Sequence, residues 1–257
     1  MRRAGLVVAN ALATTATAVK PGVTTAELDT VAAQVICAVG ATPSFLGYLG
    51  YPATTCISVN DEIVHGIPGP RVLADGDTVS IDCGAIVDGW HGDSAVTVQV
   101  GAGSAEAAAL SEATRLAMWH GIGAARLGGR IGDISAAIED YVDSLATPYG
   151  IVADYTGHGI GSAMHQPPDV PNLGRAGKGP KIVLGMALAI EPMLTAGDPA
   201  NSVLGDDWTV VTDDGSIACH WEHTMTVTEQ GIWVLTSPDG GEAMLAKLGV
   251  PFGPLAD

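Results

Sequence analysis

Residues 78–100 of the chain read TVSIDCGAIVDGWHGDSAVTVQV, and this stretch decides the fold. Its β-branched and apolar residues predict two strands, Thr78–Val87 and Ser94–Val100. Asp88-Gly89 between them is a dipeptide that tolerates the positive φ angles of a two-residue hairpin turn. We therefore expect an antiparallel hairpin here.

Two acidic residues accompany this hairpin. A turn at Asp88-Gly89 pairs Asp82 with Ala95, which makes Asp82 and Asp93 diagonal neighbours on one face, about 7–8 Å apart. Two carboxylates this close repel each other unless a cation lies between them. A pair of divalent metals, which needs bridging carboxylates, would suit the arrangement.

Two further acids lie inside apolar strand candidates, Glu191 within LAIEPM (188–193) and Glu222 within CHWEHTM (219–225). Each alone could be an outward-facing strand residue. However, neither they nor Asp82 are followed by an evident Lys or Arg partner, and an unpaired buried carboxylate costs several kcal/mol. Together they favour acids that are paired, protonated or bound to metal.

The order of helix and strand signals repeats along the chain. Ala-rich helices are expected at about 4–19 and 104–126. A second helix follows each, one opened by the Thr24–Glu27 capping box and ending near Val39, the other running from Ile134 to Leu145. The remaining strand candidates are Thr54–Val59, Ile182–Leu194, Thr209–Thr212, Ser216–Val227 and Trp233–Leu235.

This faint repeat and the hairpins predict an α+β fold with two halves, about 1–125 and 126–257. No Pro-rich or Ser-rich linker separates the halves, so residues 1–257 are expected to form a single domain. The hydrophobic content of 47% is typical of a compact globular protein.

The formal charge of −17 opposes direct binding to nucleic acid, because a phosphate backbone would be repelled. Arg175, Lys178 and Lys181 form a small cationic group, which is either a solvated loop or a docking point for something anionic. The four Cys residues are widely spaced and predict free thiols in a reducing compartment.

The N-terminus places two Arg before an apolar stretch, which a signal peptide also does, but Asn10 and repeated Thr favour a partly buried helix. No apolar stretch is long enough for a membrane span. We expect a cytoplasmic protein.

Histidines supply the other candidate site residues. His158 lies in GHGIG (157–161), where glycines allow a close backbone approach, although such a loop is equally a phosphate loop or a plain turn. His165 follows, and His65 lies in HGIP (65–68). We assign His91, His120, His220 and His223 structural roles.

The combination of these motifs resembles the signature of the type I methionine aminopeptidases. The matching segments are CISVN (56–60) with HGIP (65–68), ID (81–82) with DGWHGD (88–93), GHGIG (157–161) with His165, EPM (191–193), and EHT (222–224). Their order and spacing follow the family over essentially the whole chain. The resemblance implies a pita-bread (creatinase/aminopeptidase) fold, with pseudo-two-fold halves around a central antiparallel sheet.

The resemblance also implies a dinuclear metal site. Two divalent ions would be ligated by Asp82, Asp93, His158, Glu191 and Glu222. A mostly oxygen set with one imidazole suits Mn, Fe or Co better than a structural zinc site.

By the same resemblance, the metals activate a water that attacks the carbonyl after Met. Glu191 acts as general base, His165 stabilises the reacting carbonyl, and His65 contacts the scissile nitrogen. The Met side chain would lie against Tyr48, Tyr51, Cys56 and Trp208. Met164 replaces the aromatic residue that many relatives carry before His165, which predicts a looser pocket.

The implied function is metal-dependent removal of the initiator Met from nascent proteins whose second residue is small. The implied partners are nascent N-termini and, transiently, the ribosome, with the enzyme acting as a monomer. The alternatives are an X-Pro aminopeptidase or prolidase-like enzyme of the same fold, and a non-catalytic binding relative.

Overall fold

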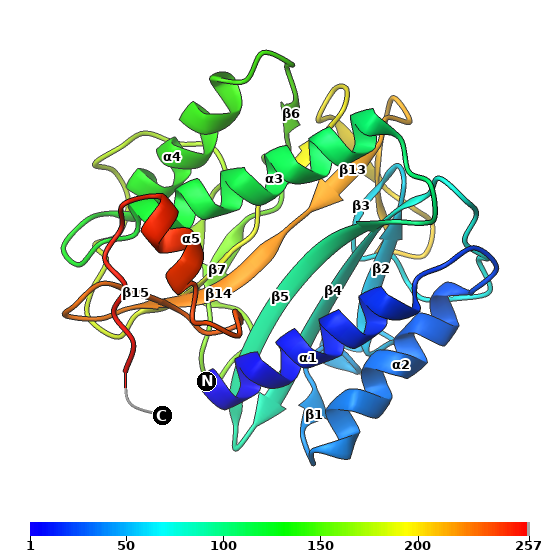
Figure 1. Cartoon of the computed structure of the whole chain (residues 1–257), viewed down its shortest axis with the longest axis horizontal. Coiled ribbons are helices and arrows are strands. Elements are labelled where there is room, and N and C mark those ends of the chain that lie inside the picture. Colours follow the sequence, from blue (N-terminus) through cyan, green and yellow to red (C-terminus); the bar gives the residue numbers. More distant parts are fainter. Residues whose placement is uncertain (256–257) are drawn as a thin grey trace.

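A computed structural model describes residues 1–255 of the chain (Figure 1). The long helices are α1 (Arg2–Ala18), α2 (Thr25–Ala38), α3 (Ala105–Ala124) and α4 (Ile131–Asp143). The short ones are the 3₁₀ turn η1 (Tyr48–Gly50) and α5 (Glu242–Lys247). The expected order of two helices followed by strands therefore occurs twice.

The strands fall into one large sheet and two small ones. The large sheet contains β1 (Thr42–Pro43), β2 (Thr55–Val59), β4 (Thr78–Val87), β5 (Trp90–Gln99), β7 (Gly157–Gly159), β8 (Gln166–Val170), β9 (Ala187–Ile190), β14 (Glu222–Val227) and β15 (Ile232–Val234). One small sheet contains β6 (Gly150–Ile151), β10 (Met193–Thr195) and β13 (Ala218–His220), and the other contains β3 (Glu62–Val64), β11 (Asn201–Val203) and β12 (Val210–Thr212).

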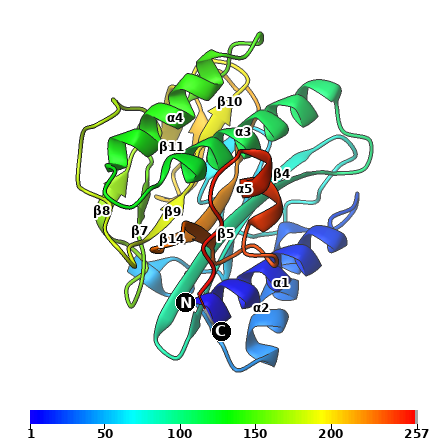
Figure 2. The same cartoon turned by 60° about the vertical axis from the view of Figure 1, so that its left-hand side comes forward.

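The predicted hairpin is confirmed as β4 and β5, which pair antiparallel from Thr78↔Gln99 to Val87↔Trp90. Asp88 and Gly89 form the turn with φ angles of 51° and 79°, as a twisted two-residue hairpin requires. The second strand is longer than predicted, because Trp90–Asp93 continue the pairing up to the turn. In the sheet order β1-β4-β5-β14-β9-β7-β8, β5 of the first half lies beside β14 of the second (Figure 2).

Two strand predictions were too long. Residues 182–194 form a turn at Gly185 (φ 74°) followed by the separate strands β9 and β10, because Pro192 between them has no N–H to donate to a ladder. Residues 216–227 likewise form β13 and β14, which separate at Trp221. Glu191 and Glu222 therefore lie at the ends of strands rather than within them.

The helices cover one face of the large sheet, with α1 and α2 over the first half and α3 and α4 over the second (Figure 1). Odd-numbered β4 residues, including Ile81 and Cys83, join Val8 and Leu12 of α1 in one buried cluster. Because side chains alternate along a strand, Asp82 points to the opposite face. The helix-covered face is therefore core, and the other face is free to form a site.

The predicted N-terminal helix is confirmed, since Val8, Ala11 and Leu12 of α1 are buried. The capping box of α2 is also confirmed: the Glu27 N–H donates to Thr24 Oγ1 (3.2 Å) and the Thr24 N–H to the Glu27 carboxylate (2.8 Å). The four Cys residues are free, as predicted. Within residues 1–255, no helix combines the length and the apolar character that crossing a bilayer requires.

The close approach of α1 to the segment after β15 gives a stability test. A Cβ at Gly5 would overlap the carbonyl oxygen of Leu235. Gly→Ala inside a helix normally stabilises by about 1 kcal/mol, but forcing two backbones apart costs about 1–3 kcal/mol. We expect Gly5→Ala to lower the free energy of unfolding, measured by urea denaturation.

Gly205→Ala is the matched control, because a Cβ there meets open space and the φ angle is ordinary. It should change stability by less than about 0.5 kcal/mol. If Gly5→Ala were as stable as this control, the helix would not be held against Leu235 as described.

Candidate metal centre

The strand register aligns the five predicted metal ligands in two adjacent rows on the face away from the helices. In one row Asp82 pairs with Ala95, and Ala95 pairs with Glu222. Glu191 lies between β9 and β10, where β9 pairs with β14 (Ile190↔His223) and β10 pairs with β13 (Met193↔His220). Continuing either register across this gap places Glu191 opposite Glu222. The predicted pairing of Asp82 with Ala95 is therefore confirmed.

The second row runs from Asp93 to His158. Asp93 is joined to Thr224 by two hydrogen bonds, from the Asp93 N–H to Thr224 Oγ1 (3.1 Å) and from that hydroxyl to the Asp93 carbonyl (2.8 Å). Ala189 pairs with Thr224 on one side and with His158 on the other. Small side chains thus separate the ligand candidates and leave room above the sheet.

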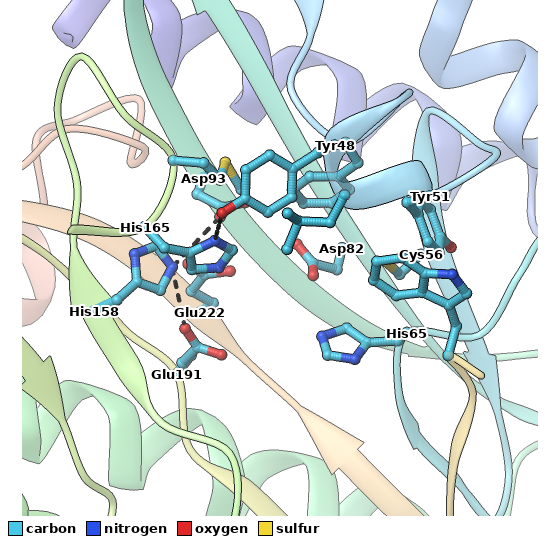
Figure 3. A pocket seen from close by; sticks show the side chains of 14 residues that line it. Tyr48, Tyr51, Cys56, His65, Asp82, Asp93, His158, His165, Glu191 and Glu222 are labelled. Atoms are coloured by element: carbon cyan, nitrogen blue, oxygen red, sulfur yellow. Dashed lines mark hydrogen bonds and ion pairs between the residues drawn. The ribbon is translucent and has the colours of Figure 1, made fainter. Parts of the chain in front are cut away.

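Figure 3 shows the five side chains converging on one pocket. The His158 Nε2 atom lies 3.5 Å from Glu191 Oε1 and 3.8 Å from Asp93 Oδ2. Ligand atoms of Asp93, His158 and Glu222 all lie within 4.8 Å of one another. This spacing lets one ion contact several of them at once.

Three carboxylate oxygens in this pocket are enclosed without a hydrogen-bond partner: Asp82 Oδ1, Asp93 Oδ1 and Glu222 Oε1. Buried charged groups left unpaired cost several kcal/mol, which a cation would offset. The donor set is four carboxylates and one imidazole, the ligands that suit divalent ions. The residues present therefore fit a divalent metal.

Burial disfavours the ionised form of all four acids, and repulsion from neighbouring carboxylates adds to this for three of them. Burial raises the pKa of Asp82 to about 7. Burial, reinforced by the neighbouring carboxylates, raises the pKa values of Asp93, Glu191 and Glu222 well above the usual range. A metal would reverse this preference, since it binds the ionised form.

The His158 ring has the tautomer and the neutral state that metal binding requires. Its Nδ1 atom lies 2.9 Å from the Gly159 carbonyl, so an Nδ1–H donates there and leaves the Nε2 lone pair free. Burial lowers the pKa of His158 to about 4, which keeps the ring neutral at pH 7. Both features favour metal binding through Nε2.

The predicted Met-binding residues Tyr48, Tyr51, Cys56 and Trp208 all line the same pocket, which encloses about 360 Å³. Tyr51 is fixed by hydrogen bonds from its hydroxyl to the Thr55 and Gly66 carbonyls, both 3.0 Å, and its ring contacts Trp208 edge to face at 5.0 Å. An apolar pocket beside a polar centre suits a thioether side chain.

His65 and His165 lie on different sides of the pocket mouth (Figure 3). His165 is exposed, and its Nδ1 atom lies 2.9 Å from the Tyr48 hydroxyl. His65 packs edge to face against Tyr155 and Trp208, and burial lowers its pKa to about 4. Both imidazoles border the space where a substrate would lie.

Three other residues in or beside the pocket were not identified from the sequence as site residues. Phe45 and Leu49 line the pocket, and no motif marked them. His220 lies with its Nε2 atom 3.8 Å from Glu191 Oε2. Alternation along residues 219–222, which places His220 and Glu222 on the same side, could have identified it.

Comparisons with known proteins find relatives over most of the chain. The sequence model of Metallopeptidase family M24 matches residues 1–229. The chain is 54% identical over 241 residues to methionine aminopeptidase 1 of Mycobacterium tuberculosis, covering 92% of this chain and 91% of that protein.

Solved structures give the same result. The methionine aminopeptidase of Thermotoga maritima matches with a TM-score of 0.90 and 40% identity, covering 92% of this chain and 95% of that one. The prolidase of Pyrococcus furiosus shares the fold at a TM-score of 0.72 and 20% identity, but this chain spans only 62% of its length. The expected α+β pita-bread fold is thereby confirmed.

The buried acids, the neighbouring imidazole and the apolar pocket thus occur in a chain that these relatives match over about nine-tenths of its length. The chain belongs to metallopeptidase family M24 and, within it, to the type I methionine aminopeptidases.

Proposed function

We propose that this methionine aminopeptidase removes the initiator Met from nascent proteins at a two-metal centre held by Asp82, Asp93, His158, Glu191 and Glu222. The observation that supports this most directly is the set of three enclosed carboxylate oxygens without partners, facing one pocket beside the free Nε2 of His158. Four acids provide more negative charge than one divalent ion balances, and bridging carboxylates are typical of paired metals. Mn, Fe and Co suit this donor set.

The metals would lower the pKa of a water molecule and polarise the substrate carbonyl. Glu191 would accept the proton of the attacking water and pass it to the scissile nitrogen as the C–N bond breaks. The Tyr48 hydroxyl lies 2.9 Å from Nδ1 of His165. In the tautomer with the proton on Nε2, the hydroxyl donates to Nδ1, and the Nε2–H would stabilise the charge that develops on the carbonyl oxygen. His65, held neutral, contacts the scissile nitrogen and assists its departure.

The pocket supports specificity for a free N-terminal Met. The Met side chain lies among Tyr48, Tyr51, Cys56 and Trp208, and its α-amine lies near the acids. Met164 completes the apolar wall, where it is buried with Phe45, Tyr51 and Cys56. A flexible thioether at this position gives a more adaptable pocket than a rigid ring would. The residue after Met must be small.

The setting of the reaction is also a proposal. We infer that residues 1–257 form one catalytic domain, which acts as a cytoplasmic monomer on the N-termini of emerging chains and docks transiently on the ribosome. The loops around the α4 N-terminus support docking, since they gather five of the 11 Lys and Arg residues of a chain with charge −17. These exposed residues, named here the basic cluster, are Arg126, Arg130, Arg175, Lys178 and Lys181.

Hydrogen bonds to backbone carbonyls hold the two loops of the basic cluster together. The Gly132 N–H donates to the Lys178 carbonyl (3.0 Å), and the Arg130 guanidinium donates to the Gly179 carbonyl (2.7 Å). The grouping of Arg175, Lys178 and Lys181 that the sequence indicated is therefore enlarged by two Arg residues. Such a patch attracts a phosphate backbone within about 8–10 Å despite the net charge.

Peptide hydrolysis tests the proposed reaction. Chelator-stripped protein with added Mn²⁺ or Co²⁺ should release Met from Met-Ala-Ser and not from Met-Arg-Ser, while the stripped protein cuts neither. Free Met is measured by chromatography. Cleavage of X-Pro peptides instead would favour the prolidase-like alternative, and inertness toward every peptide would favour a non-catalytic binding relative.

Metal removal should make stability depend on pH. The four acids have pKa values in the folded state above those in the unfolded state. Their contribution to the free energy of unfolding is therefore present at low pH and is lost as the pH rises through the folded pKa values. For Asp82 the folded pKa is about 7. The buried imidazoles have lowered pKa values in the folded state, so their contribution to the free energy of unfolding grows as the pH rises. It changes little once the pH is above the unfolded His pKa of about 6.5.

Between about pH 7 and 8 the acids therefore dominate. The free energy of unfolding of the stripped protein should fall by roughly 1–3 kcal/mol over this unit, corresponding to one or two extra protons in the folded state. Saturating Mn²⁺ should abolish or reverse the fall, because ligation requires ionised acids. Equal slopes with and without metal in urea titrations would contradict a metal centre at these acids.

The docking proposal predicts a local charge effect. Lys178→Glu combined with Lys181→Glu should weaken co-sedimentation with bacterial ribosomes about tenfold at low salt and leave peptide hydrolysis unchanged. Lys20→Glu combined with Lys247→Glu changes the net charge equally at exposed positions outside the cluster and serves as the control. Equal loss in both double variants would show that only net charge matters.

A further inference from the structure

One imidazole beside the metal centre has no role in the mechanism above. His220 ends β13 and is 2% exposed, yet its Nε2 atom has no hydrogen-bond partner. A buried polar atom left unpaired costs about 1–3 kcal/mol. An apolar residue at this position would avoid this cost.

The Nε2 atom of His220 faces the Glu191 carboxylate. It lies 3.8 Å from Glu191 Oε2, while the other oxygen, Oε1, lies 3.5 Å from His158 Nε2. Glu191 is thus bracketed by two imidazoles, one for each oxygen. Closing the His220 contact to an ordinary N–H···O distance takes a shift of roughly 0.8 Å, which the broad terminal torsion of a Glu side chain permits.

The backbone of His220 is firmly anchored. Its N–H lies 3.2 Å from Ser80 Oγ and 3.1 Å from Thr97 Oγ1, and its carbonyl accepts the Thr97 hydroxyl at 2.7 Å. Ser80 and Thr97 are themselves cross-strand partners in the β4–β5 hairpin that carries Asp82 and Asp93. The backbone that carries the imidazole is therefore fixed relative to the hairpin that carries Asp82 and Asp93, whereas Glu191 lies at a break between strands.

We propose that His220 is a positioning residue that donates a hydrogen bond from Nε2 to Glu191 Oε2, and so keeps Oε1 directed toward His158 and the metal centre. The inference rests on the role proposed above for Glu191. Once Glu191 is ionised by a bound metal, Oε2 is an acceptor that matches the unpaired donor. A group that orients a metal ligand in this way commonly changes metal affinity or activity by 10–100-fold when it is removed.

Three variants of His220 and one control test this role. His220→Leu and His220→Met replace the imidazole with an apolar side chain of similar size that has no donor. His220→Gln keeps an N–H donor. Mn²⁺ affinity is measured by calorimetry on chelator-stripped protein, and kcat and KM are measured on Met-Ala-Ser. His120→Leu is the control, because His120 lies on α3 against Tyr141 and outside the pocket.

We expect the Leu and Met variants to bind Mn²⁺ about tenfold more weakly and to lose about tenfold in kcat, with KM within twofold. His220→Gln should stay within about threefold of the parent in both measurements. The use of two donor-free variants guards against one of them failing to fold, which thermal melting reports. Normal Mn²⁺ affinity and kcat in a folded Leu or Met variant would overturn the proposal, as would equal loss in the Gln variant.

Glu191→Gln, assayed in parallel, separates this inference from the proposed function. If Glu191→Gln kept both activity and Mn²⁺ affinity, the role of Glu191 itself would be wrong. If Glu191→Gln lost them while the folded His220 variants did not, only the positioning role of His220 would fail.

Discussion

The structure depends on the electrostatic cost of enclosing four carboxylates in one pocket. Burial raises the pKa values of Asp82, Asp93, Glu191 and Glu222, and neighbouring carboxylates raise those of Asp93, Glu191 and Glu222 further. Divalent ions bound between the carboxylates would offset that cost directly, because they pair the buried charges. The strands, the small residues and the surrounding imidazoles are arranged so that these acids stay close together without filling the space between them.

The sheet keeps the acids close together because side chains alternate between its two faces along each strand. On β4, Ile81 and Cys83 pack beneath the helices, and Asp82 between them points to the other face. Ala95 and Ala189 then occupy positions between ligand candidates, where a larger side chain would occupy the space above the sheet. One face thus supplies the hydrophobic burial that stabilises the fold, and the other can tolerate unfavourable charge.

The two halves contribute unequally to the site, which explains why neither half alone would suffice. Asp82 and Asp93 come from the first half, and the other three ligand candidates come from the second. They meet because β5 and β14 pair at Ala95↔Glu222 and His223↔Ser94. The hydroxyls of Thr97 and Thr224 add side-chain hydrogen bonds across the same junction, so its register is specified by polar contacts as well as by packing.

Local sequence determined the elements and one part of the site. The Asp88-Gly89 turn alone fixes the pairing of Asp82 with Ala95, because a two-residue hairpin leaves no freedom of register. The capping box at Thr24 and the helical spacing in α1 to α4 are equally local. The motifs around His158, Glu191 and Glu222 identified the other ligand candidates through resemblance to a family rather than through geometry. The tertiary structure decided how the halves join and that His220 faces Glu191. These features depend on contacts between residues far apart in the chain, and no local pattern encodes the distances between such residues.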